Sequence, residues 1–101
     1  MDKPLIVVNF KTYETAMGDS ALTLAKAMDN FTDRDFRMIA VVSAFDLSSI
    51  SNSVSSVEVW SQHLDPVGKG SHTGWLEPDL AIHHGAVGTI INHAEHKVNI
   101  E

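Results

Sequence analysis

Residues 4–13 read PLIVVNFKTY, a short apolar run that ends in polar side chains. The run from Leu5 to Phe10 is continuous, rich in β-branched residues and preceded by Pro4. A continuous run is typical of a strand covered on both faces, whereas a surface strand alternates apolar and polar residues. The stretch therefore predicts a first strand inside a parallel α/β sheet.

Similar apolar runs recur along the chain and alternate with helical patterns. The expected strands are residues 5–10, 36–42, 57–62 and 86–93. The expected helices are residues 15–31 with Asp19 or Ser20 as cap, a short segment opened by Ser43, residues 77–84 between Pro78 and Gly85, and a first turn or two in residues 94–101. This order predicts parallel strands joined by crossover helices, and no boundary divides the single unit of residues 1–101.

Composition narrows the class of protein. The 101 residues are 44% hydrophobic and 20% charged, with a formal net charge of −6 and no cysteine. A negative chain without a basic run repels nucleic acid and anionic membranes, and no apolar stretch approaches the roughly 20 residues that cross a bilayer. The absence of cysteine suits a reducing compartment, so we expect a cytoplasmic protein.

Polar side chains follow the first and the fourth expected strands. Asn9 and Lys11 are two residues apart and share one face of an extended segment, as do His93 and Glu95. Parallel α/β folds bind ligands at the carboxyl ends of their strands, where a cation and an imidazole could converge on one ligand. Taken singly, a solvated Lys11 is the better interpretation, and a structural His93 is at least as good an interpretation as a functional one.

Three other motifs are weaker. The loop GKGSHTG at residues 68–74 lacks the spacing of a phosphate-binding loop, which favours a projecting loop that docks into a partner. The adjacent pair His83 and His84 diverges, and His93 and His96 need a common helical face to share a metal, so no metal site is expected. No serine lies in a nucleophile elbow, which argues against serine hydrolysis.

Four motifs in this order resemble triosephosphate isomerase, specifically its shorter archaeal form: VVNFKTY (7–13), SQHLDP (61–66), GSHTG (70–74) and GAVGTIINHAEH (85–96). The resemblance implies the N-terminal half of a TIM (β/α)8 barrel, strands one to four, where a complete barrel has about 250 residues. It also implies the interconversion of dihydroxyacetone phosphate and glyceraldehyde 3-phosphate, a step of glycolysis and gluconeogenesis. That reaction uses no metal and no organic cofactor.

The resemblance assigns roles to individual residues. Asn9 and Lys11 match the pair that contacts substrate, and His93 matches the imidazole that polarises the carbonyl. Glu95 matches the carboxylate that pairs with the lysine, and a helix beginning near Ala94 would keep the imidazole neutral. Oligomer contacts match Gln62, Gly70, Ser71, His72, Thr73 and Gly74. Ala94 departs from the family, which usually has a serine there.

The family's general base, a glutamate after strand six, and its phosphate-binding loops have no counterpart in these 101 residues. We therefore expect negligible isomerase activity from this chain alone. Strands one and four would be open edges beside an exposed apolar inner face, which predicts self-association or pairing with a complementary C-terminal half-barrel. One alternative is a non-catalytic, self-associating half-barrel module, natural or engineered. Another is a full enzyme of which these residues are one fragment.

Overall fold

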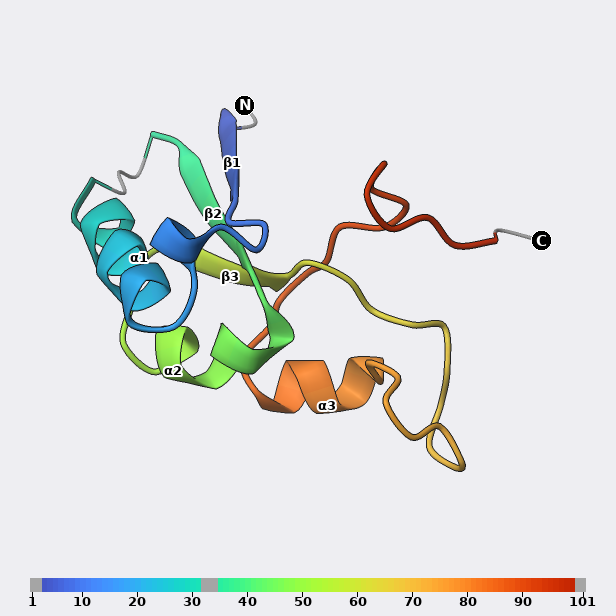
Figure 1. Cartoon of the computed structure of the whole chain (residues 1–101). Helices are drawn as coiled ribbons and strands as arrows, with labels where there is room; N and C mark the ends of the chain where they lie inside the picture. The colour runs from blue at the N-terminus through green and yellow to red at the C-terminus, as the bar shows by residue number, and fades with distance from the viewer. Residues whose placement is uncertain (1–2, 32–34, 100–101) are drawn as a thin grey trace.

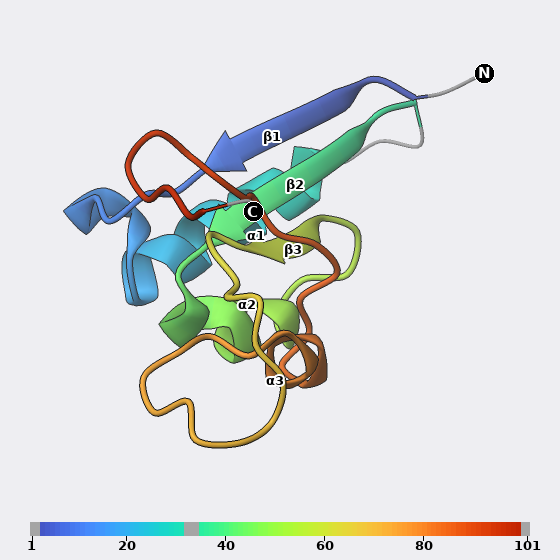
Figure 2. The ribbon, with the colours of Figure 1, turned by 90° about the vertical axis from the view of Figure 1, so that its right-hand side faces the viewer.

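A parallel sheet of three strands forms the centre of the computed structural model, which describes residues 3–31 and 35–99. The strands β1 (Leu5–Asn9), β2 (Arg37–Val42) and β3 (Glu58–Ser61) lie side by side in chain order (Figures 1 and 2). The β1–β2 register pairs Val7 with Ile39, and the β2–β3 register pairs Val41 with Trp60. This agrees with the parallel arrangement predicted from the strand and helix order.

The helices follow the predicted order with sharper boundaries. They are the 3-10 turns η1 (Glu14–Ala16) and η2 (Ala44–Asp46) and the helices α1 (Asp19–Phe31), α2 (Leu47–Ser51) and α3 (Pro78–His83). The helix expected from residue 15 begins at Asp19, because Gly18 adopts φ +57° and separates η1 from α1. Three predicted end residues are confirmed: Ser43 Oγ accepts from the Phe45 N–H, Pro78 opens α3, and Gly85 follows it at φ +102°. The cap predicted at Asp19 or Ser20 is wrong, because both residues lie inside α1.

The fourth expected strand is reduced to a parallel bridge between Thr89 and Ser61. The Val87 N–H donates to the Val59 carbonyl at 3.0 Å, and the Ser61 N–H donates to the Gly88 carbonyl at 3.0 Å. The segment therefore lies beside β3 in the predicted position. It does not continue as a strand because Asn92 adopts a left-handed backbone, φ +57°.

The prediction of a helix in residues 94–101 is wrong for residues 94–99, which form a turn and irregular structure. Residues 100 and 101 lie outside the described residues. The His96 N–H donates to the His93 carbonyl at 2.8 Å, and the Val98 N–H donates to Asn92 Oδ1 at 2.6 Å. The Asn92 side chain thus closes the segment into a compact loop, which we call the 92–98 turn. No helix N-terminus stands beside His93 in the described residues.

The core lies between the sheet and the helices, with Ala25 of α1 and Ile50 of α2 fully buried (Figure 2). β2 is buried over Ile39–Val42, as expected for a strand covered on both faces. β1 departs from that prediction: Leu5, Ile6 and Val7 are 49%, 42% and 45% exposed. The reason is position, because β1 is the edge strand and no other strand in the described residues pairs with its outer side. None of the described helices combines the length and the hydrophobicity needed to cross a membrane.

Candidate active site

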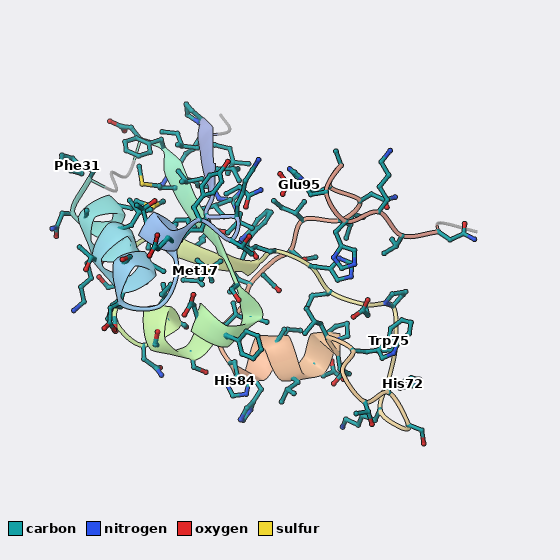
Figure 3. All side chains as sticks on the ribbon, in the orientation of Figure 1. Met17, Phe31, His72, Trp75, His84 and Glu95 are labelled. Atoms are coloured by element: carbon teal, nitrogen blue, oxygen red, sulfur yellow. The ribbon has the colours of Figure 1, made fainter. Side chains whose placement is uncertain are left out.

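A cleft of about 710 Å³ opens at the carboxyl ends of the strands. Its lining includes Asn9 and Lys11 after β1, Gln62 after β3, and His93 and Glu95 from the 92–98 turn. Figure 3 shows Glu95 on that turn, on the opposite side of the sheet from Met17 and Phe31. The structure therefore brings together both pairs of residues that the strand-end argument selected.

Lys11 and Glu95 form the central ion pair of the cleft. Lys11 Nζ lies 2.7 Å from Glu95 Oε1 and 5.8 Å from the centre of the Tyr13 ring. The hydrogen bond to Glu95, reinforced by its charge, raises the pKa of Lys11, and the same bond lowers the pKa of Glu95. Both groups therefore stay charged across the physiological range, and the ammonium remains available to an anionic ligand at the cleft surface.

The backbone of Lys11 is held in an unusual conformation by its neighbours. Its φ of +53° lies in the left-handed region, which a lysine rarely adopts. The Lys11 N–H donates to Asn9 Oδ1 at 2.9 Å, and the Gln62 amide donates to the Lys11 carbonyl at 2.6 Å. Residues from β1 and from the end of β3 thus fix where the ammonium points. Gln62, assigned above to the oligomer contacts, faces this backbone within the chain.

His93 is held in one tautomer by the turn that carries it. The Glu95 N–H donates to Nδ1 of His93 at 3.2 Å, so Nδ1 is an acceptor and the proton of the neutral ring sits on Nε2. The Glu95 carboxylate lies 4.0 Å from the same nitrogen. This arrangement leaves the Nε2–H of a neutral imidazole to act as a hydrogen-bond donor toward a ligand.

The loop of residues 68–74 projects away from the sheet, as predicted (Figure 1). Gly70, Ser71, His72, Thr73 and Gly74 are all exposed. Asp65 closes the base of the loop: its N–H donates to the Leu76 carbonyl at 2.8 Å, and its carboxylate accepts from the Leu76 N–H at 2.7 Å. Two hydrogen bonds between Asp65 and Leu76 therefore close the loop at its base.

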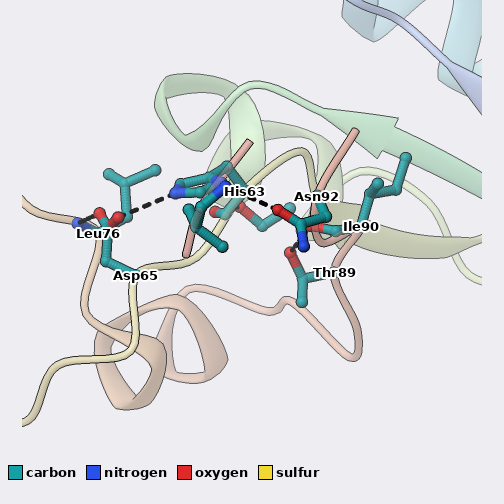
Figure 4. Close-up of polar contacts among 8 residues, drawn as sticks. His63, Asp65, Leu76, Thr89, Ile90 and Asn92 are labelled. Atoms are coloured by element: carbon teal, nitrogen blue, oxygen red, sulfur yellow. Dashed lines mark hydrogen bonds and ion pairs between the residues drawn. The ribbon is translucent and has the colours of Figure 1, made fainter. Parts of the chain in front are cut away.

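Sequence reasoning missed the side chains that form that wall. His63 Nε2 donates to Asp65 Oδ1 at 2.9 Å (Figure 4). The His63 ring also stacks on His96, with 3.9 Å between ring centres. His63 and Asp65 share a face of an extended segment, which is a weak signal. The contact with His96 joins residues 33 positions apart and has no local signal at all. No group of three possible metal ligands occurs among the residues that the structure describes.

Comparisons with known proteins match the sequence and the fold to one family. The family model for triosephosphate isomerase matches residues 4–101. The triosephosphate isomerase of Archaeoglobus fulgidus is 38% identical over 97 residues, which cover 95% of this chain and 43% of that protein. The enzyme of Methanothermus fervidus is 37% identical over 101 residues, which cover 99% of this chain and 45% of that protein.

A solved structure agrees with the sequence matches. The crystal structure of triosephosphate isomerase from Bartonella henselae superposes with a TM-score of 0.77 and 25% identity, covering 93% of this chain and 39% of that chain. This chain therefore spans less than half the length of the relatives that it matches. With the family model covering almost all of its residues, the chain belongs to the triosephosphate isomerase family.

Proposed function

We propose that this chain supplies the substrate-polarising half of a triosephosphate isomerase active site. The observation that carries the proposal is the cluster of Lys11, Glu95 and His93 at one edge of the sheet. In this proposal Lys11 offsets the charge of the phosphate and of the enediolate, and Asn9 contacts the substrate beside it. His93 donates from Nε2 to the carbonyl oxygen and moves protons between the two substrate oxygens. The substrate is the triose phosphate pair, dihydroxyacetone phosphate and glyceraldehyde 3-phosphate.

The reaction also needs a base that removes the proton next to the carbonyl. Two carboxylates that line the described cleft have other partners: Glu95 is paired with Lys11, and Glu77 accepts from the Asp79 and Leu80 N–H groups at the start of α3. Neither is placed as a free base. We therefore propose that the 101 residues on their own polarise the substrate without isomerising it, and that the proton is removed by residues beyond this half of the barrel.

A chimera tests whether this chain polarises the substrate while the other half of the barrel removes the proton. The chain is fused to the part of the Archaeoglobus fulgidus relative that it does not match, and both the chimera and the chain alone are assayed by coupling glyceraldehyde 3-phosphate formation to NADH production. We expect turnover from the chimera and none above background from the chain alone. Near-native turnover by the chain alone, or a folded chimera without activity, would contradict the proposal.

We also propose that the chain folds as one unit and associates, either with itself or with a complementary half-barrel. The supporting observation is apolar exposure: Leu5, Ile6 and Val7 lie on the sheet edge, and Phe45 is 99% exposed. Burying such surface contributes about 25 cal/mol per Å². In this proposal the exposed loop Gly70–Gly74, with Thr73 as its contact residue, is a second contact surface. A cytoplasmic location is consistent with the absence of cysteine.

Light scattering tests the association directly. At micromolar concentration we expect a mass of at least twice the 11.0 kDa of one chain, and a Thr73→Arg variant should shift the population toward single chains. Thr23→Arg is the matched control, because Thr23 is exposed on α1, outside that loop and outside the cleft lining. A stable, folded single chain in dilute solution would rule association out.

A further inference from the structure

The stacked rings of His63 and His96 join two parts of the cleft that are far apart in sequence. His63 follows β3 and is 7% exposed, whereas His96 belongs to the 92–98 turn and lies at the surface. Their ring centres are 3.9 Å apart with an interplanar angle of 14°. No other ring contact recorded for the described residues reaches the 92–98 turn.

Each ring is connected to a functional segment. On one side His63 donates to Asp65, whose carboxylate also accepts from the Leu76 N–H at the base of the projecting loop (Figure 4). On the other side the His96 N–H donates to the His93 carbonyl at 2.8 Å. The stack therefore lies between the base of the loop and the residue proposed to polarise the substrate.

We propose that His63 and His96 are positioning residues that hold the 92–98 turn against the cleft wall, and that the turn is released when both rings are protonated. Two imidazolium rings at this separation repel each other, whereas a neutral ring stacks on either form. Asp65 interacts with the charges of both rings, but its single negative charge faces two positive ones. Because the turn carries His93 and Glu95, the role rests on the function proposed above, but its test requires no isomerase activity.

The charged groups around the stack keep their charges at pH 5, so the response to acid is assigned to the two stacked rings. The hydrogen bond from the Leu76 N–H keeps the pKa of Asp65 below its ordinary value despite partial burial. The hydrogen bond and charge of His63 and the charge of His96 act in the same direction, so Asp65 stays ionised at pH 5. The Lys11–Glu95 pair also stays charged there, since the pKa of Lys11 is raised and that of Glu95 is lowered. The other ionisable groups on the cavity wall are Glu77, His84 and His93.

Backbone ¹⁵N order parameters for Glu95, His96 and Val98 in the full chain, at pH 7.5 and 5.0, test the role. We expect about 0.85 at pH 7.5 and below about 0.6 at pH 5.0. His96→Phe keeps a ring but cannot gain a proton, so these amides should stay rigid at both pH values. His96→Ala removes the ring at an exposed position, and the amides should be mobile at both.

His96→Phe also distinguishes protonation of the stacked pair from protonation of His93, because that variant still contains His93. If protonation of His93 alone loosened the turn, His96→Phe would respond to acid as the native chain does. His83→Phe, at an exposed position outside the stack, is the matched control and should behave like the native chain. Equal order parameters at both pH values in the native chain, an acid response in His96→Phe, or a rigid turn in His96→Ala at pH 7.5 would overturn the proposal.

Discussion

Lys11→Met in the chimera is expected to lower kcat/KM by about 10²–10³-fold, the usual effect of removing one preorganised group that stabilises developing charge. Lys11 brings the only ammonium among the residues that line the described cleft, 2.7 Å from Glu95. Methionine keeps the length of the side chain but cannot offset the charge of a phosphate or an enediolate. The measurement is the coupled isomerase assay at pH 7.5, with kcat and KM determined separately.

Lys26→Met is the matched control for this variant. Lys26 lies exposed on α1, so its loss should leave kcat/KM within about twofold of the unmodified chimera. Circular dichroism of both variants checks that each is folded. The proposed role of Lys11 fails if a folded Lys11→Met chimera retains the kcat/KM of the Lys26→Met chimera.

Ile50→Ala is expected to reduce the free energy of unfolding by about 2–5 kcal/mol, a large part of the roughly 5–15 kcal/mol that stabilises a typical domain. Ile50 lies on α2, is 0% exposed and belongs to the cluster that packs α1 and α2 against the sheet. Removing its outer methyl and methylene groups leaves a cavity that these short elements can fill only in part. Urea denaturation followed by circular dichroism gives the change.

Ile82→Ala is the same substitution at a position that is 64% exposed on α3. We expect a change within about 0.5 kcal/mol. Both variants are measured at one protein concentration, because association would stabilise the folded state by mass action. Equal destabilisation by the two variants would show that the described core does not hold the chain together.

Much of the fold could be predicted because its signals are local. The apolar runs of β1, β2 and β3, the Ser43 cap and the Pro78 start of α3 each depend on a few neighbouring residues. The predictions of a full fourth strand and of a helix after it were wrong, because one backbone angle decides the structure there. Asn92 in the left-handed region ends the extended segment and turns the chain back through its bond with the Val98 N–H.

The candidate site was predictable in part for the same reason. Asn9, Lys11, His93 and Glu95 were selected by their place at strand ends and by their resemblance to known motifs, and the structure gathers them in one cleft. The contacts that hold them were not predictable. Two of them join segments that are far apart in sequence: the hydrogen bond from the Gln62 amide to the Lys11 carbonyl, and the His63–His96 stack. No local sequence pattern predicts contacts of this kind.

By itself the sequence determined the family, the parallel order of strands and helices, and the polar side chains that line the cleft at the strand ends. Only the tertiary structure decided how these side chains are held. Asp29 shows this away from the site: its carboxylate accepts from the N–H groups of Ser55, Ser56 and Val57, and so joins α1 to the start of β3. The physical reason is that strands and helices arise from local backbone preference and apolar spacing, whereas long-range polar contacts depend on where distant segments meet in space.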